Sequence, residues 1–466
     1  MYVTEFVTRS RTTPRCYAEA VVRKFVVSVV AAGVLLPFPI LLFLSETPVL
    51  RLPASATVIG PATPFAVAVD DPHGVRSVHV YAEQGGARYD LYRTSFPSRR
   101  ILWQRHLPAA TFRFVAGTKT TPQLKDGKAR LVAEAVSNDL RGSTATLERE
   151  ITVITRPPSL SADSDQHYLY QGMADATTFD VSGYWTEAGV RVGDETFRSW
   201  PLPGDKTGAK PGRFALYAFA WNMPRSAVPT VYATNPAGTE VTVPLVVVFP
   251  AKEQPHYSTR DLDVSDAFMQ KVVNELDPGG SGDPMTRFLK INGAMRRANN
   301  QTLSDLRNKT ESRFLWSQPF LQQKNSKVES SFADVRNYIY HGKKIDQQVH
   351  LGYDLAITKH VGVEASNDGR VVYAAPLGIY GNCIVVDHGY GLQSIYGHLS
   401  EIGVHEGDMV KRGQIMGRSG ETGMAGGDHI HFTMQLDGVQ IDPKEWFDTH
   451  WIRDHVAKRV EIPGFR

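Results

Sequence analysis

The chain has 466 residues, a formal net charge of +3 and 21% charged residues. At about 100–200 residues per domain, this length is sufficient for about three domains. The net charge is too small to argue for a nucleic-acid partner. Cys16 and Cys383 are the only cysteines and form no CxxC element, which excludes a thiolate zinc site and a disulfide framework of several bridges.

The first apolar segment, residues 25–44, predicts a retained transmembrane anchor. It has Ser28 as its only polar side chain and is long enough to cross about 30 Å of hydrocarbon as a helix. Residues 1–24 are basic, and Arg51 alone follows closely, so the N-terminus is predicted to be cytoplasmic and the rest of the chain outside. A cleavable signal peptide is the alternative, because Ala54-Ser55-Ala56 has the small-x-small form that a signal peptidase accepts.

The next two hundred or so residues are typical of β structure. Alternating or continuous apolar runs of strand length predict two β-sandwich-like modules, at 55–157 and 158–250, each closing at proline. A spacer or ligand-presenting role is favoured over carbohydrate binding, because isolated tryptophans normally pack in cores or at their rims.

Residues 261–312 predict a helical connector. Ser265 can cap a helix over 266–276, and Asp283-Pro284 begins a second helix that runs to about Arg297. Both helices carry an apolar stripe. This section could pack beside the site of the following domain and restrict entry, or it could be a passive connector, and the sequence does not separate the two.

The last region combines clustered histidines with frequent glycines. Eight of the fifteen histidines lie between residues 341 and 431, and glycines separate short apolar runs as in tight antiparallel hairpins. His429 and His431 are two apart on a predicted strand, so their side chains face one cleft. A cross-strand packing pair is the alternative, but His350, Asp354 and His398 in accompanying segments favour a metal site.

Five such side chains exceed the needs of one catalytic zinc ion. Such an ion keeps three protein ligands and leaves a fourth position for water, whose pKa it lowers to about 7. The two surplus histidines suit general acid–base work, because an unperturbed imidazole has a pKa of about 6.5. Which of the five are ligands is not decided by this count.

Residues 332–446 resemble the lysostaphin-type, or LytM-like, zinc metalloendopeptidases that cut peptide cross-links of bacterial cell walls. The motifs that carry the resemblance are His350-Leu351-Gly352-Tyr353-Asp354-Leu355-Ala356, Asp368-Gly369-Arg370-Val371-Val372, Tyr380-Gly381-Asn382 through Asp387-His388-Gly389, Tyr396-Gly397-His398-Leu399-Ser400, and Gly420-Glu421-Thr422-Gly423 leading to His429-Ile430-His431-Phe432. The resemblance implies one zinc ion held by His350, Asp354 and His431. It also implies that His398 and His429 act on the water and the oxyanion.

The expected fold is therefore mainly β, with an N-terminal transmembrane helix, two sandwich-like modules, a short helical section and an antiparallel-β LytM-like peptidase domain at 313–466 that includes a C-terminal extension. The resemblance implies a zinc endopeptidase that hydrolyses amide bonds of peptidoglycan stem peptides or cross-bridges. With the anchor, this predicts activity at the outer face of the bacterial cytoplasmic membrane, in the periplasm or outside the cell. A regulatory protein is a further candidate partner.

Two other functions compete with this prediction. The first is a non-hydrolytic scaffold that binds the wall or activates another hydrolase, the role of family members that have lost ligands; here none is missing. The second is a zinc carboxypeptidase, which is disfavoured because no arginine is obviously positioned to bind a terminal carboxylate.

Overall fold

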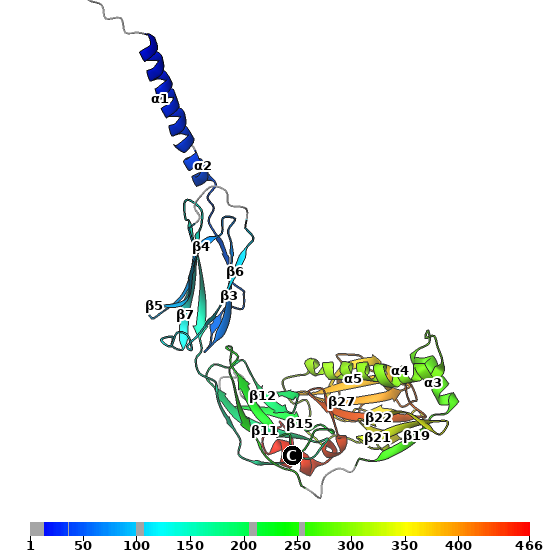
Figure 1. The fold of residues 1–466 in the computed structure, drawn as a ribbon. Helices are drawn as coiled ribbons and strands as arrows, with labels where there is room; N and C mark the ends of the chain where they lie inside the picture. The colour runs from blue at the N-terminus through cyan, green and yellow to red at the C-terminus, as the bar shows by residue number, and fades with distance from the viewer. Residues whose placement is uncertain (1–13, 36, 99–106, 205–211, 251–256) are drawn as a thin grey trace, which may run out of the picture. The chain divides into compact units, whose positions relative to one another are not determined.

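The computed structural model describes residues 14–35, 37–98, 107–204, 212–250 and 257–466 (Figure 1). These residues are mainly β with a few helices. The chain divides into two compact units. One comprises Met1–Arg156 and Pro236–Thr239, and the other comprises Pro157–Asn235 and Glu240–Arg466.

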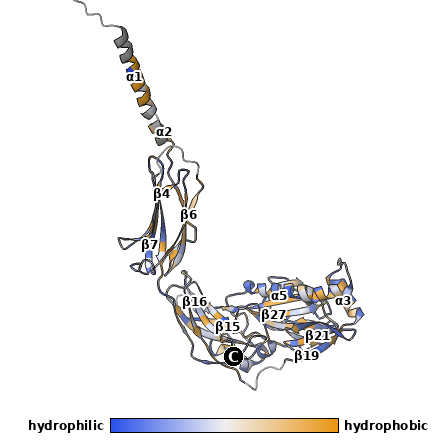
Figure 2. Cartoon of the chain, viewed as in Figure 1, coloured by the Kyte–Doolittle hydropathy of each residue, from blue (hydrophilic) through white to orange (hydrophobic). Residues whose placement is uncertain are grey.

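Two helices begin the described chain. The predicted anchor, residues 25–44, falls on α1 (Pro14–Leu35) and α2 (Pro37–Phe43), and the apolar part of α1 is visible in Figure 2. No helix in the described ranges combines the length and apolar character needed to cross a membrane. Residues 1–13 of the predicted basic N-terminus lie outside the described residues. The membrane anchor therefore stays a prediction.

The β structure of the first unit consists of two sheets around one core. One sheet has the order β1-β3-β6 and the other β2-β8-β7-β4-β5. Val67, Val80 and Leu131 are fully buried between them, because alternate side chains of each strand point inward. The strands are β1 (Val49–Arg51), β2 (Val58–Ile59), β3 (Thr63–Asp70), β4 (Val75–Gln84), β5 (Ala87–Ser95), β6 (Ala110–Ala116), β7 (Gly127–Ser137) and β8 (Thr144–Val153).

The second unit begins with another β module. Its sheets have the orders β14-β15-β11-β9 and β13-β12-β16-β17, and β10 pairs with β18 in parallel. The strands are β9 (Ser159–Ala162), β10 (Gln166–Tyr168), β11 (Ala174–Ser182), β12 (Glu187–Val192), β13 (Glu195–Arg198), β14 (Trp200–Pro201), β15 (Gly212–Ala218), β16 (Thr230–Thr234), β17 (Glu240–Pro244) and β18 (Val246–Val248). The module shares one hydrophobic core with the C-terminal domain; for example, Phe214 packs edge-on against Tyr390 at 4.8 Å between ring centroids.

A buried ionic cluster joins this module to the C-terminal segment. His167 Nδ1 lies 2.8 Å from Asp175 Oδ2, its Nε2 lies 3.2 Å from Asp163 Oδ1, and Arg459 Nη1 lies 3.3 Å from Asp175 Oδ1. Burial raises the pKa of Asp163, but hydrogen bonds from His167 and two threonines outweigh this effect and bring the pKa to about 2. The cluster thus favours charged carboxylates in the folded unit.

The helical section follows the β modules. Helix α3 (Asp266–Leu276) confirms the first predicted helix, and the Ser265 hydroxyl accepts a hydrogen bond from the Phe268 N–H at 3.2 Å, as expected of its cap. The second predicted helix is longer than expected. It consists of α4 (Pro284–Lys290), a π-helical turn (Ile291–Met295), α5 (Arg296–Asp305) and a 3₁₀ turn (Leu306–Lys309). Its apolar stripe packs on the C-terminal sheet, and this packing supports the helix past Arg297.

The C-terminal domain is built on an eight-stranded sheet. The order is β20-β23-β31-β27-β26-β25-β29, and β32 pairs with β31. Smaller sheets, β19-β21-β22 and β24-β30-β28, complete the domain. The strands are β19 (Thr259–Asp263), β20 (Lys327–Ser330), β21 (Asp334–Tyr340), β22 (Lys343–His350), β23 (Tyr353–Ala356), β24 (Gly362–Glu364), β25 (Gly369–Pro376), β26 (Asn382–Gly389), β27 (Leu392–Leu399), β28 (Glu401–Ile402), β29 (Met409–Val410), β30 (Ile415–Arg418), β31 (His429–Leu436) and β32 (Val439–Ile441). The chain ends with a 3₁₀ turn (Pro443–Phe447), α6 (Thr449–Ile452) and a π-helical turn (Arg453–Ala457).

The buried ionic cluster predicts a pH-dependent stability of the second unit. The pKa of Asp163 falls from 3.8 to about 2 on folding, so its contribution is present above pH 4 and is lost as the pH falls through 2. We expect Asp163→Asn to lower the free energy of unfolding by about 2 kcal/mol at pH 6.5, and by less than half of that at pH 2.5. Urea unfolding of the full chain measures both values.

Asp165→Asn is the matched control, because the Asp165 side chain is 50% exposed and its only ion pair, with Lys458, is 3.7 Å long. It should change stability little at either pH. An equal loss for Asp163→Asn at both pH values would show that the cluster does not act through its charge.

Candidate metal centre and active site

Strand β31 brings the candidate site residues together. Asp354 on β23 lies opposite His431 in the antiparallel pair β23–β31, and Gly397 on β27 lies opposite His431 from the other side. His429 and His431, two apart on β31, share one face of the sheet. The register thus places residues from three separate motifs around the first turn of one strand.

The three predicted metal ligands converge on one point. His350 Nε2 lies 3.0 Å from Asp354 Oδ1 and 2.9 Å from His431 Nδ1, and these last two atoms are 3.4 Å apart. All three side chains are largely buried, with exposed fractions of 5%, 15% and 6%. The group has the composition and spacing to hold a metal ion.

The other two predicted histidines lie beside this group. The rings of His398 and His429 are 4.8 Å apart between centroids, and His398 is 5.9 Å from the His431 ring. His429 Nε2 reaches Asp354 Oδ1 at 3.4 Å. The backbone of His398 has a positive φ of 63°, an uncommon conformation that holds its ring at the end of β27. All five residues singled out from the sequence thus share one site, and their individual roles stay predictions.

Backbone carbonyl groups fix the orientation of three of these rings. The Nδ1 atoms of His350, His398 and His429 each lie within hydrogen-bonding distance of a carbonyl oxygen. The acceptors are Ser331, Thr422 and Gly427, at 3.1, 2.9 and 2.7 Å. A ring nitrogen that faces a carbonyl must carry the proton, so in the neutral ring Nε2 keeps its lone pair. The lone pair of each Nε2 is thereby available to the site.

The donor atoms are charged as a metal ion requires. Burial lowers the pKa of His431 to about 4 and also lowers the pKa of His350, so both rings are neutral at pH 7. Burial raises the pKa of Asp354, but the neighbouring His350, His429 and His431 outweigh it and hold this pKa well below its ordinary value. Arg336 also donates a hydrogen bond to Asp354 Oδ2.

This arrangement fits a divalent cation. His350 Nε2 presents a lone pair to His431 Nδ1 and to a carboxylate oxygen at contact distance. Electron-pair donors repel one another at such distances unless a proton or a cation lies between them. Two neutral imidazoles and one carboxylate are a ligand set that zinc accepts, and they leave a position open.

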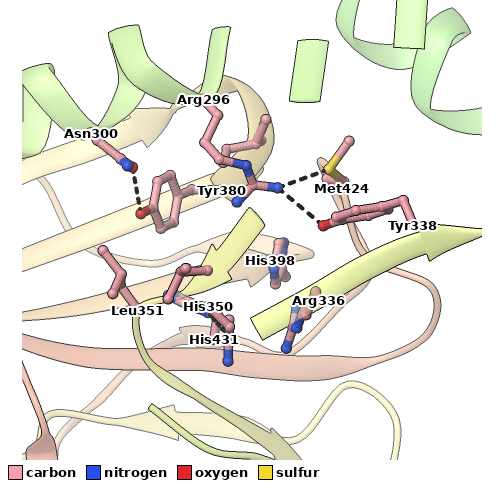
Figure 3. A pocket seen from close by; sticks show the side chains of 12 residues that line it. Arg296, Asn300, Arg336, Tyr338, His350, Leu351, Tyr380, His398, Met424 and His431 are labelled. Atoms are coloured by element: carbon pink, nitrogen blue, oxygen red, sulfur yellow. Dashed lines mark hydrogen bonds between the residues drawn. The ribbon is translucent and has the colours of Figure 1, made fainter. Parts of the chain in front are cut away.

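A small cavity lies over the group (Figure 3). It has a volume of about 40 Å³, room for a small polar group. Its floor includes His350, His398 and His431, and its opposite wall includes Arg296 and Asn300 of α5. The helical section therefore packs beside the site, which was one of its two predicted positions.

The helical section also holds the loop that orients His398. Lys271 Nζ donates to the carbonyl oxygens of Gly423 and Ala425 at 3.0 and 3.1 Å, and Glu275 accepts a hydrogen bond from the Gly423 N–H. The adjacent Thr422 carbonyl is the acceptor for His398 Nδ1. Packing of α3 on this loop thus supports the position of a candidate catalytic ring.

Two residues differ from their predicted places. His388, predicted in a hairpin turn, is fully buried in β26, where Nε2 lies 2.7 Å from Ser394 Oγ. Asp428, predicted as an exposed turn residue, has a side chain only 4% exposed and accepts a hydrogen bond from the His360 N–H at 3.1 Å. Both predictions were wrong because hydrogen bonds to distant segments allow these polar groups to be buried. His360 and His405 are exposed loop residues, as predicted.

Four cavity residues received no role from the sequence: Arg296, Asn300, Arg336 and Tyr380. Tyr380 packs edge-on against His431 at 5.3 Å, and its hydroxyl donates to Asn300 Oδ1 at 2.9 Å. Tyr380 stands in a quoted motif, and Arg336 stands in the run that leads into the domain. Nothing in the local pattern of Arg296 or Asn300 signalled a site.

Comparison with known proteins places the same region in a family. Residues 348–443 match the family model described as Peptidase family M23. The DD-carboxypeptidase/endopeptidase Mpg of Neisseria meningitidis is 33% identical over 96 residues, 21% of this chain and 22% of that protein. The peptidoglycan DD-endopeptidase ShyA of Vibrio cholerae is 39% identical over 93 residues, 20% of this chain and 22% of that protein.

A third relative is named for a different role. The murein hydrolase activator EnvC of Escherichia coli is 33% identical over 95 residues, 20% of this chain and 23% of that protein. The chain thus spans less than a quarter of the length of each of these three relatives. The similarity covers the candidate metal centre and leaves the β modules and the helical section outside the matched region.

The close packing of Gly352 against His431 predicts a sensitive position. A Cβ atom at Gly352 would lie 2.6 Å from His431 Cε1 and 2.9 Å from the Phe432 carbonyl oxygen, so Gly352→Ala must displace the ring. We expect the affinity for a divalent metal ion to fall by about 10-fold or more, since ligand geometry determines metal affinity. Competition with a metal-binding dye measures this affinity.

Gly426→Ala is the control, because a Cβ there meets no atom within 4 Å. It should bind metal as the unmodified chain does. Unchanged metal affinity in Gly352→Ala would show that His431 does not ligate the ion.

Proposed function

Because the chain belongs to Peptidase family M23 through residues 348–443, we propose that it is a zinc-dependent endopeptidase that hydrolyses amide bonds of peptidoglycan stem peptides or cross-bridges. One observation carries the proposal: His350, Asp354 and His431 present their ligand atoms within 4.8 Å of one another, with two further histidines beside them. The names of the Mpg and ShyA relatives support peptidoglycan peptides as the substrate class.

His350 Nε2, Asp354 Oδ1 and His431 Nδ1 would hold the ion. Bound zinc would act as a Lewis acid that polarises the scissile carbonyl and makes water more acidic. Arg336 would keep Asp354 charged and fixed through its hydrogen bond to Oδ2. No side chain needs to form a covalent bond to the substrate.

His398 and His429 would handle protons and the developing oxyanion. Each ring donates its Nδ1–H to a carbonyl group, so each can accept a proton at Nε2 or, once protonated, donate it. One ring would take a proton from the attacking water, and the other would hydrogen-bond the oxyanion or protonate the leaving amine. Burial in the cavity strengthens these interactions by excluding water.

An activator of another cell-wall hydrolase is the second candidate function. The EnvC relative is named for that role, and the chain has a β module in one compact unit with the peptidase-like domain. A regulatory protein partner would fit this function. The complete set of ligands and histidines favours hydrolysis, because a scaffold has no use for a buried, metal-competent group.

The proposed location is the outer face of the bacterial cytoplasmic membrane. Its support is the apolar segment 25–44 with basic residues before it, and a substrate class found outside that membrane. Fractionation of cells that express the full chain, with protease added from outside, would test this part of the proposal separately.

Digestion of purified peptidoglycan tests the proposed activity. The full chain loaded with zinc should release new amino and carboxyl termini, identified by mass spectrometry. A chelator should abolish this release and added zinc should restore it. Release that a chelator leaves unchanged would contradict the zinc mechanism, and no release by the zinc-loaded chain would favour the activator.

Variants of the five site residues separate metal binding from turnover. We expect His398→Ala and His429→Ala to keep zinc and lose turnover by about 100-fold or more. The variants expected to lose zinc as well are His350→Ala, Asp354→Ala and His431→Ala. His405→Ala, whose side chain is 93% exposed, is the control and should keep both. Loss of zinc in His429→Ala with zinc retained in His431→Ala would overturn this division of roles.

A further inference from the structure

We propose that Arg296 binds a carboxylate group of the peptide substrate and so determines the specificity of the site. The inference rests on the proposed hydrolase function and deepens it. It assigns a substrate class, peptides with a free carboxylate near the scissile amide, to a residue outside the family-matched region.

Arg296 lies in the wall of the cavity that faces the metal-competent group. It is the first residue of α5, and it lines the same cavity as His350, His398 and His431. Figure 3 shows its guanidinium group directed toward Tyr338 and Met424, above the histidines. A peptide bound with its amide at the histidines would therefore come within the neighbourhood of this cation.

The charge of Arg296 is not neutralised by the protein. Among the residues that the structure describes, no carboxylate forms an ion pair with it; its hydrogen-bond acceptors are Asn292, Tyr338 and Met424. The other cavity arginine, Arg336, differs because it is paired with Asp354. A partly buried cation normally has an acidic partner, so an unpaired one in a cavity indicates that an anion is supplied from outside.

The guanidinium group is held in place by a buried amide. Asn292 is fully buried, and its Oδ1 accepts from Arg296 Nη2 at 2.7 Å and from Nε at 3.2 Å. Asn292 Nδ2 in turn donates to Asp346 Oδ2 at 2.7 Å, which fixes the amide with its oxygen toward the arginine. Such preorganisation reduces the entropy lost when a ligand binds.

The helix geometry at this point has a function-related form. Asn292 belongs to the π-helical turn Ile291–Met295, and Arg296 follows this turn directly. π-helical turns inside α-helices occur frequently at functional sites. The turn interrupts the helix where the amide and the guanidinium group meet over the cavity.

The rest of the cavity wall is suited to an anion. The imidazole rings of His350 and His431 are neutral, because burial lowers the pKa of both. The hydroxyl groups of Tyr338 and Tyr380 add polarity without charge. A carboxylate is the anion that a peptide offers, and arginine binds it through two parallel hydrogen bonds.

Two kinds of carboxylate present this chemistry in a wall peptide: the main-chain terminus and an acidic side chain. A terminal carboxylate would give the site carboxypeptidase character, whereas an internal one would give an endopeptidase selective for acidic stems. The sequence offered no arginine for the first possibility, and Arg296 supplies one.

Binding of paired peptides to the full chain tests the proposal. One pair is acetyl-Lys(acetyl)-D-Ala-D-Ala and its C-terminal carboxamide, and the other is acetyl-Ala-γ-D-Glu-Lys-D-Ala-carboxamide and the same peptide with its glutamate α-carboxyl amidated. Calorimetry with chelator-treated protein measures binding without turnover. We expect amidation in one pair to weaken binding by about 10- to 100-fold, the range for a hydrogen bond to a charged group.

Variants of Arg296 identify the source of that discrimination. Arg296→Gln should bind the acid and the amide of the sensitive pair equally, and Arg296→Lys, which keeps the charge but loses the paired hydrogen bonds, should show an intermediate ratio. Arg297→Ala, an exposed neighbour, should keep the full ratio. A ratio unchanged in both Arg296 variants, or no ratio in either pair, would overturn the proposal.

Turnover of the same peptides by zinc-loaded protein separates this proposal from the proposed function. If the carboxylate site is correct, Arg296→Gln should raise KM for the sensitive acid peptide and leave KM for its amide unchanged. Arg296-dependent binding without hydrolysis of any peptide would refute the peptidase and leave the carboxylate site standing. Hydrolysis that does not distinguish acid from amide in either pair would refute the carboxylate site and leave the peptidase standing.

Discussion

The site depends on three electron-pair donors that the sheet holds at contact distance. His350, Asp354 and His431 come from three consecutive elements of the pairing pattern, and their ligand atoms lie 2.9–3.4 Å apart. The antiparallel register fixes Asp354 opposite His431, so neither can withdraw without breaking the sheet. Such crowding costs free energy unless a cation occupies the centre, and the fold is therefore built for a bound metal ion.

The helical section gives this metal-competent sheet its local environment. Helix α3 holds the loop of Thr422, which orients His398, and α5 forms the far wall of the cavity. These helices lie outside the region shared with Peptidase family M23. The general chemistry thus resides in the shared strands, whereas the choice of substrate belongs to a segment particular to this chain.

Much of the site could be predicted from the sequence, because its donors stand in short motifs with strand spacing. His429 and His431 share a face through the two-residue period alone. Arg296 could not be found in this way, since its position depends on how a helix packs on a sheet about fifty residues further along the chain. The shared core of the second β module was also hidden, because a buried strand has the same pattern whichever domain covers it.

The most direct measurement is a crystal structure of the zinc-loaded chain with diffraction data on both sides of the zinc absorption edge. The account predicts one anomalous peak in the domain, about 2.0–2.2 Å from His350 Nε2, Asp354 Oδ1 and His431 Nδ1, with a coordination position open toward His398 and His429. A peak elsewhere, or one bonded to His398 or His429 in place of these three atoms, would contradict the account.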